Sequence, residues 1–210
     1  MIRNIIWDFD GTLFDTYPAI IHGWMYALEQ QGIAVSEERI SDLIRVSFTH
    51  CAETLEREAG VNIEELESSF PKYYRGFPAE DQPPFEGVRE VCRYILSIRG
   101  ANIIVTHRPI DTAKPILKAR GMVDYFRDIY SLHDGYPGKP DPAMFRLALE
   151  QHHLNPEETL AVGDRDIDLR AGESAGLRTC YYDVFNQKMN ADITIQDYFQ
   201  LMEILKEESN

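Results

Sequence analysis

Short apolar runs that alternate with helical patterns restrict the fold of this chain more than any other feature of its sequence. Runs of three or four residues rich in aliphatic, β-branched or aromatic side chains occur at 5–7, 103–105, 129–132, 160–162 and 180–182. Runs this short, bounded by polar or turn residues, are typical of strands buried on both faces of a sheet. Because helical patterns separate most of them, the sequence predicts the α/β class, with a doubly wound, mostly parallel sheet and helices on both faces.

Two of the connecting segments carry clear helix signals. Apolar residues recur with the helical period between 88 and 96, and Gly100 is expected to cap that helix at its C-terminal end. Another helix is expected from Pro142 to about His153, with Asp141 as its N-cap and proline in its first turn. Helical connections of this kind join neighbouring parallel strands.

The segment 16–84 breaks the alternation, because it contains only helical signals. Its first helix is marked by an apolar stripe made of Ile20, Ile21, Trp24, Met25 and Leu28. Further helices are expected at about 36–46, 49–59 and 63–76. The sequence therefore predicts an α/β core formed by 1–15 and 85–210, and an inserted helical lid formed by 16–84.

Polar residues follow four of the predicted strands. The groups are Asp-Phe-Asp-Gly-Thr at 8–12, Thr-His-Arg at 106–108, Gly-Lys-Pro at 138–140 and Gly-Asp-Arg-Asp-Ile-Asp at 163–168. In open α/β sheets, ligands bind beyond the carboxyl ends of the strands. We therefore expect these four groups to converge on one edge of the sheet.

The carboxylates in these groups favour a metal site. Asp8 and Asp10 are two residues apart and face the same side of extended backbone, where they repel each other unless a cation or a proton intervenes. Asp164 and Asp168 are four residues apart, on one face of an opening helical turn. An oxygen-rich pocket of this kind suits Mg²⁺, which takes few carboxylates and retains water.

The remaining groups favour an anion next to that metal. Lys139 supplies a positive charge and Thr106 a hydroxyl, both suited to phosphate oxygens. Gly11 allows a tight turn in which backbone amides can approach an anion, and Gly11 and Thr12 are therefore possible substrate contacts. His107 and Arg108 are possible substrate contacts, although a purely structural role explains each of them as well.

Two competing motifs are absent. An EF-hand loop that began at Asp8 would need glycine at its sixth position and glutamate at its twelfth, where Leu13 and Ala19 stand. The segment before Lys139 resembles a phosphate loop only superficially, because Pro140 stands where that motif has serine or threonine. Nucleotide-dependent functions therefore lose support.

Composition excludes several classes of partner. Lys and Arg total 21 against 35 Asp and Glu, which gives a formal net charge of −14. A surface this acidic repels the phosphate backbone of nucleic acids. The first residues lack the apolar run of a signal peptide, and no stretch approaches the ~18 apolar residues of a membrane span. We expect a cytoplasmic protein that acts neither on nucleic acid nor at a membrane, as a monomer or a homodimer.

Taken in order, these motifs resemble those of the haloacid dehalogenase superfamily, in the branch that carries a helical cap after its first strand. Phosphoglycolate phosphatases and β-phosphoglucomutase belong to that branch. Residues 8–13 (Asp-Phe-Asp-Gly-Thr-Leu) resemble its first motif and Thr106 its second. Lys139 resembles the third motif, and Asp164 with Asp168 the fourth. The resemblance covers nearly the whole chain.

The resemblance implies a role for each motif residue. Asp8 would attack phosphorus, and Asp10 would protonate the leaving oxygen and then activate water. Mg²⁺ would be held by Asp8, the backbone carbonyl of Asp10, Asp164 and Asp168, with Thr106 and Lys139 on the phosphoryl oxygens. An acid at position 10 also makes carbon–halogen and carbon–phosphorus cleavage unexpected.

The expected function is Mg²⁺-dependent hydrolysis of a small phosphomonoester metabolite, of the phosphoglycolate or sugar phosphate type. A phosphomutase would use the same residues, and a receiver-type signalling domain phosphorylated on Asp8 is a further alternative that the helical insertion disfavours. In the resembling enzymes the cap selects the leaving group. The cap residues that are candidates to reach a substrate are Arg45, His50, Lys72, Tyr73 and Arg75.

Overall fold

The computed structural model describes residues 1–184 and 186–208, apart from the side chains of Pro71 and Lys72. Within these residues, six strands form one parallel sheet in the order β3-β2-β1-β4-β5-β6. The strands are β1 (Asn4–Trp7), β2 (Asn102–Thr106), β3 (Asp128–Ser131), β4 (Thr159–Gly163), β5 (Arg178–Tyr182) and β6 (Ile193–Ile195). The predicted α/β class and doubly wound sheet are confirmed.

Strand positions agree with the apolar runs, with two exceptions. Leu132 was expected in the third strand but begins a short 3₁₀ helix, η3 (Leu132–Asp134), which the Ser131 side chain caps. The sequence also gave no prediction of β6, a three-residue edge strand in which only Ile193 and Ile195 are buried. A segment this short has too few alternations to be separated from a loop.

The described residues contain nine α-helices. They are α1 (Tyr17–Gln30), α2 (Glu37–Val46), α3 (Phe48–Ala59), α4 (Ile63–Gly76), α5 (Val88–Ser97), α6 (Ile110–Ala119), α7 (Ala143–Gln151), α8 (Asp166–Ser174) and α9 (Tyr198–Glu207). Short 3₁₀ helices are η1 (Ala79–Asp81), η2 (Val123–Tyr125) and η4 (Pro156–Glu158). In the part of the chain that these elements cover, no helix is both long and apolar enough to cross a bilayer.

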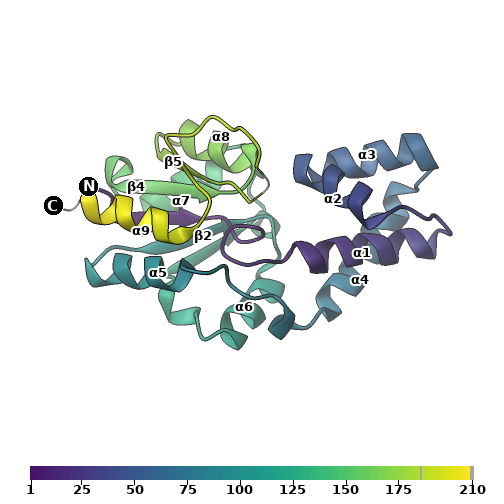
Figure 1. The fold of residues 1–210 in the computed structure, drawn as a ribbon, viewed down its shortest axis with the longest axis horizontal. Helices are drawn as coiled ribbons and strands as arrows, with labels where there is room; N and C mark the ends of the chain where they lie inside the picture. Colours follow the sequence, from purple (N-terminus) through teal and green to yellow (C-terminus); the bar gives the residue numbers. More distant parts are fainter. Residues whose placement is uncertain (185, 209–210) are drawn as a thin grey trace. The chain divides into compact units, whose positions relative to one another are not determined.

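Alternate residues of β1 place helices on both faces of the sheet. Ile6 belongs to a buried cluster with Phe145 of α7 and Ala171 of α8. Its neighbour Trp7 points to the opposite face, where its ring centroid lies 5.8 Å from that of Tyr198 in α9. Helix α9 packs against α5 on that face, as the lower part of the α/β unit in Figure 1 shows. Side chains on both faces of β1 are therefore buried against helices, which places this strand at the centre of the α/β unit.

Gly100 has a second role besides the one predicted. Helix α5 ends at Ser97, and Arg99 adopts a positive φ of 61°. The Gly100 amide then donates to the Ile95 carbonyl at 2.9 Å, which caps the end of the helix. A Cβ atom on Gly100 would lie 1.7 Å from the carbonyl oxygen of Arg3, so the close approach of two backbone segments also requires glycine here.

The start of α7 is also displaced from its prediction by one residue. Pro142 is the N-cap itself, and the first helical residue is Ala143. Asp141 still supports the helix start, because its Oδ1 accepts a hydrogen bond of 2.9 Å from the Ala143 amide. The helix ends at Gln151, two residues before the expected end at His153.

The chain divides into two compact units, one formed by residues 1–15 with 83–210 and the other by residues 16–82. Pro83 and Pro84 belong to the first unit because both contact the segment after β1. The Pro83 carbonyl accepts from the Asp15 amide at 2.9 Å, and Pro84 forms a β-bridge with Phe14.

The second unit, residues 16–82, is a bundle of α1 to α4. Side chains of Ser36, Ser47 and Asn62 cap the N-termini of α2, α3 and α4, each by accepting a backbone N–H. The stripe predicted for α1 is buried at Ile20, Ile21, Trp24 and Leu28, but Met25 is 37% exposed and lies outside it.

Candidate active site

The predicted strand-end groups follow strands that lie side by side. Asp8 comes directly after β1, Thr106 is the last residue of β2, and Asp164 comes directly after β4. Strand β1 lies between β2 and β4, so the chain reverses its winding direction at this point of the sheet. Open α/β sheets bind ligands at such a reversal, beyond the carboxyl ends of the strands.

Three buried carboxylates meet at this edge. Ligand oxygens of Asp8, Asp164 and Asp168 all lie within 4.8 Å of one another, and these residues are 1–2% exposed. Thr12 links two of them, because its hydroxyl donates to Asp164 Oδ1 at 2.9 Å and lies 3.5 Å from Asp8 Oδ2. Thr12 was expected as a possible substrate contact; in the structure it contacts the carboxylates.

Lys139 provides a buried positive charge beside this cluster. Its Nζ contacts Asp8 Oδ1, lies 2.5 Å from Asp168 Oδ1 and donates to the carbonyl of Val105 at 3.3 Å. Burial opposes the charged form of Lys139, but the Asp168 and Asp8 carboxylates outweigh it and raise its pKa above the ordinary value. The lysine therefore carries its charge at neutral pH.

The pKa values of the two carboxylates in contact with Lys139 shift in opposite directions. Burial raises the pKa of Asp8 to about 7, against the lowering effect of Lys139, and the charges of Asp168 and Asp164 add to the rise. Burial also disfavours the charged form of Asp168, but Lys139 and Arg165 lower the pKa of Asp168 below its ordinary value. A cation at the cluster would stabilise the ionised form of Asp8.

The side chain of His107 contacts the backbone of the loop that carries Lys139. The Lys139 amide donates to His107 Nε2 at 2.8 Å, so this nitrogen carries no proton. Burial, followed by the charges of Lys139 and Arg165, lowers the pKa of His107 to about 3. In the structure, His107 is a neutral hydrogen-bond acceptor that fixes the Lys139 loop.

Arg108 forms an ion pair with Asp10. Its Nε and Nη2 each lie 2.9 Å from Asp10 Oδ1. The arginine side chain is 1% exposed, whereas that of Asp10 is 16% exposed and more accessible. The backbone amide of Arg108 donates to Thr106 Oγ1 at 3.0 Å, which leaves the buried hydroxyl its own proton to donate.

Gly11 lies in the turn that directly follows Asp10. Its φ of 77° lies in the left-handed region, as a tight turn requires. Its amide donates to the carbonyl of Phe14 at 2.9 Å, within the same turn. In the structure, the Gly11 amide therefore stabilises this turn.

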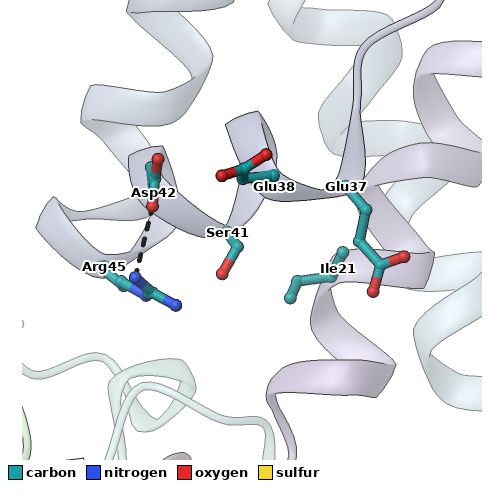
Figure 2. Close-up of a pocket in the computed structure, with 6 residues that line it drawn as sticks. All are labelled: Ile21, Glu37, Glu38, Ser41, Asp42 and Arg45. Atoms are coloured by element: carbon teal, nitrogen blue, oxygen red, sulfur yellow. Dashed lines mark hydrogen bonds and ion pairs between the residues drawn. The ribbon is translucent and has the colours of Figure 1, made fainter. Parts of the chain in front are cut away.

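The helical unit carries the other predicted contacts. Arg45 of α2 pairs with Asp42 at 3.3 Å and lines a hollow of about 510 Å³ with Ile21, Glu37, Glu38 and Ser41 (Figure 2). His50 is exposed near the start of α3. Tyr73 stacks on Tyr26, and Arg75 is exposed. The side chain of Lys72 lies outside the described residues.

Two residues beside the site went unrecognised in the sequence. Arg165 is 7% exposed, and its amide donates to Asp168 Oδ2 at 3.1 Å. Tyr198 of α9 donates its hydroxyl to the Thr12 carbonyl at 2.7 Å. No sequence signal links Tyr198 to the first motif, which lies 186 residues earlier.

Comparison with known proteins places this geometry in a family. The model of the haloacid dehalogenase-like hydrolases matches residues 5–182. The chain belongs to the haloacid dehalogenase-like hydrolase family. A phosphoglycolate phosphatase of Pectobacterium atrosepticum is 30% identical over 85% of this chain and 79% of its own length. The pyrophosphatase PpaX of Bacillus velezensis is likewise 30% identical, over 85% of this chain and 82% of its own.

A solved structure shows the same fold. The crystal structure of a predicted phosphoglycolate phosphatase from Haemophilus somnus superposes with a TM-score of 0.83 at 21% identity, over 97% of this chain and 98% of that one. The recognition of the haloacid dehalogenase family from the sequence is therefore confirmed. The family includes curated phosphatases, and phosphatase chemistry is the function that it supports for this chain.

Proposed function

We propose that this chain is a Mg²⁺-dependent phosphatase that hydrolyses a small phosphomonoester through an aspartyl-phosphate on Asp8. The observation that carries the proposal is the environment of Asp8. Its buried carboxylate lies at the carboxyl end of β1, against Lys139 and beside Asp164 and Asp168. A carboxylate surrounded in this way is held ready as a nucleophile toward an anionic phosphoryl group, which the lysine attracts.

Separate residues would serve the two halves of the reaction. Asp8 attacks phosphorus while Asp10 delivers a proton to the leaving oxygen. Asp10 then takes a proton from the water that attacks the aspartyl-phosphate, so that both carboxylates return to their starting states. Thr106 and Lys139 hold the oxygens of the transferring group, with the Thr106 proton available for donation.

The buried carboxylates fit a magnesium ion. Asp8, Asp164 and Asp168 supply hard oxygen ligands within one small pocket, and the Asp10 carbonyl is the expected fourth protein ligand. The ion would neutralise charge on the phosphoryl oxygens. Its charge would also offset the burial and, after it, the neighbouring carboxylates that raise the pKa of Asp8.

The substrate we propose is a small phosphorylated metabolite. The net charge of −14 makes the surface unfavourable for large polyanions, whereas Lys139, Arg108 and Arg165 supply buried positive charge at the site itself. Relatives named for phosphoglycolate and pyrophosphate show how small the substrates of this family can be. Both compounds belong in the first set of substrates to test.

Residues 16–82 are proposed to act as a cap that selects the leaving group. They are inserted between β1 and the rest of the α/β unit, directly after the turn that carries Asp8 and Asp10. Arg45 and His50 are the proposed substrate contacts in this unit. A cap that closes during turnover excludes bulk water from the phosphoryl-enzyme.

Arg45 gives a direct test of the cap proposal. With the preferred metabolite, Arg45→Ala should raise KM about 10-fold, the cost of losing one charge-assisted hydrogen bond. Arg39→Ala is the matched control, since Arg39 lies on the same helix and pairs with Glu58 at 2.9 Å on the surface. An unchanged KM for Arg45→Ala would remove this residue from the substrate site.

The experiment that tests the function is a screen of phosphorylated metabolites with and without Mg²⁺. Phosphoglycolate, pyrophosphate, sugar phosphates and p-nitrophenyl phosphate form the panel, and release of inorganic phosphate is measured. The wild-type protein should release phosphate only with Mg²⁺, and Asp8→Asn should release none. Retained turnover by Asp8→Asn would overturn the assignment, and conversion of glucose 1-phosphates to an isomer without phosphate release would identify a phosphomutase instead.

A further inference from the structure

Arg108 contacts Asp10 through two nitrogens of its guanidinium. Two nitrogens of one guanidinium, Nε and Nη2, converge on a single oxygen, Asp10 Oδ1, each at 2.9 Å. The arginine is 3% exposed as a whole residue, so its charge is removed from water and directed at this carboxylate. Buried guanidinium–carboxylate pairs of this geometry fix orientation as well as charge.

Arg108 is itself held from several sides. Its amide donates to Thr106 Oγ1 at 3.0 Å, and its carbonyl accepts from the Ser131 hydroxyl at 2.8 Å. The guanidinium carbon lies 5.1 Å from the centre of the Phe9 ring, within range of a cation–π contact. The ends of β2 and β3 therefore hold the backbone of Arg108, and Phe9, the residue between the two motif aspartates, contacts its guanidinium.

We propose that Arg108 is the residue that positions Asp10 for proton transfer, and that it does not bind the substrate. The inference rests on the proposed phosphatase function, in which Asp10 handles a proton in both half-reactions. Arg108 holds one oxygen of the Asp10 carboxylate in a fixed place relative to Asp8. The role predicted from the sequence, a substrate contact, would direct this guanidinium to the phosphoryl group instead of to Asp10.

The two roles predict different kinetics. A positioning residue contributes to the chemical steps, so its loss lowers kcat and leaves KM unchanged. A substrate ligand contributes to binding of the phosphoryl group, so its loss raises KM. Displacement of a reacting group by about 1 Å can lower a rate about 100-fold, which sets the size of the expected effect.

The test compares Arg108→Gln, Arg108→Lys and a control. Values of kcat and KM are measured on the phosphoglycolate or sugar phosphate that the screen identifies as a substrate, because its alkoxide leaving group needs a proton. Arg108→Gln should lose about 100-fold in kcat at an unchanged KM. Arg108→Lys keeps the charge but not the planar pair of donors, so its kcat should fall less than that of the glutamine variant. The control is Arg3→Gln. Arg3 precedes β1 and forms an exposed ion pair with Glu158 at 3.6 Å. This variant should retain wild-type kcat and KM. Melting curves show whether each variant folds; the lysine variant keeps the test valid where the glutamine variant does not fold.

A double-mutant cycle decides whether Arg108 acts through Asp10. In the Asp10→Asn protein, phosphorylation of the enzyme by p-nitrophenyl phosphate is measured in a single turnover, since p-nitrophenolate leaves without needing a proton. Adding Arg108→Lys to Asp10→Asn should cause no further loss of this rate. A full, additive loss in the double variant, or a raised KM in the single variants, would overturn the proposal.

The outcome separates this inference from the proposed function. A wild-type protein that releases phosphate, together with Arg108 variants of normal kcat, would reject the positioning role and leave the phosphatase assignment in place. A wild-type protein without Mg²⁺-dependent phosphate release would reject the phosphatase assignment itself, and the inference with it.

Discussion

At the scale of single residues, the site is a set of buried charges whose partners decide their roles. Asp8 contacts Lys139, Asp10 contacts Arg108, and Asp164 accepts from Thr12. Lys139 also contacts Asp168, and Thr12 also lies 3.5 Å from Asp8, so these partners are shared within the cluster, whereas Asp10 is held by Arg108. The two aspartates of the first motif are two residues apart in sequence, but different side chains hold them, which is what separate roles in one reaction require.

His107 provides a prediction about stability and pH. Its pKa is lowered to about 3 in the folded protein, below the value of an unfolded histidine. Between these values the unfolded chain binds more protons, so stability contributed by neutral His107 is complete above the unfolded pKa and is lost as pH falls toward 3. The loss should reach about 1.4 kcal/mol per pH unit at most.

The measurement is urea unfolding of wild-type and His107→Gln proteins at a series of pH values below 6.5, the ordinary histidine pKa. Glutamine keeps an acceptor for the Lys139 amide but does not titrate, so the variant should lose less stability on acidification. His153→Asn, at an exposed position with a φ of 52°, should behave as the wild type. Equal acid sensitivity of wild-type and His107→Gln proteins would show that His107 is not the neutral group described above.

At the scale of elements, the C-terminal helix supports the first motif. Tyr198 of α9 donates to the Thr12 carbonyl at 2.7 Å, and its ring lies 4.6 Å from that of Tyr182 and 5.8 Å from that of Trp7. The residue is fully buried. A helix that ends the described chain thus fixes the backbone of the turn that holds Asp8 and Asp10.

Tyr198→Phe tests this support. The variant leaves a buried carbonyl unsatisfied and should lose about 1–3 kcal/mol of unfolding free energy. It should also lower kcat, because the turn that places Asp8 loses one anchor. Tyr94→Phe is the matched control. Tyr94 lies on α5, and its hydroxyl donates to the carbonyl of Leu205 in α9 at 3.3 Å, at a part-buried site. The account of α9 fails if Tyr198→Phe keeps the same kcat as the wild type and the Tyr94→Phe control.

At the scale of the whole molecule, sequence patterns were sufficient for what depends on local chemistry. Five strands, the four helices of residues 16–82 and the convergence of polar strand ends followed from runs of apolar residues and their spacing. The haloacid dehalogenase family followed from the order of the four motifs. These signals are short-range, and each one is repeated at several places in the chain.

Features that depend on distant contacts were not predictable from the sequence. Gly100 was expected to cap a helix, which it does, but no local signal showed that the backbone of Arg3 approaches it too closely for a side chain. Arg108 has the charge and the hydrogen-bond donors of a phosphate ligand. Only the fold brings it to Asp10, which lies 98 residues earlier. The contact of Tyr198 with Thr12 has the same origin. Side chains whose partners lie on other elements reveal their roles only when the sheet order is known.

The central claim is that Asp8 becomes phosphorylated during turnover. The direct measurement is an acid quench of the wild-type protein with Mg²⁺ and its preferred substrate, followed by mass spectrometry of the peptide that contains Asp8. The account predicts a phosphoryl group on Asp8 that hydroxylamine removes, and no such group in Asp8→Asn. Turnover with no phosphoryl group on Asp8 at any time point, or with the group on another residue, would contradict it.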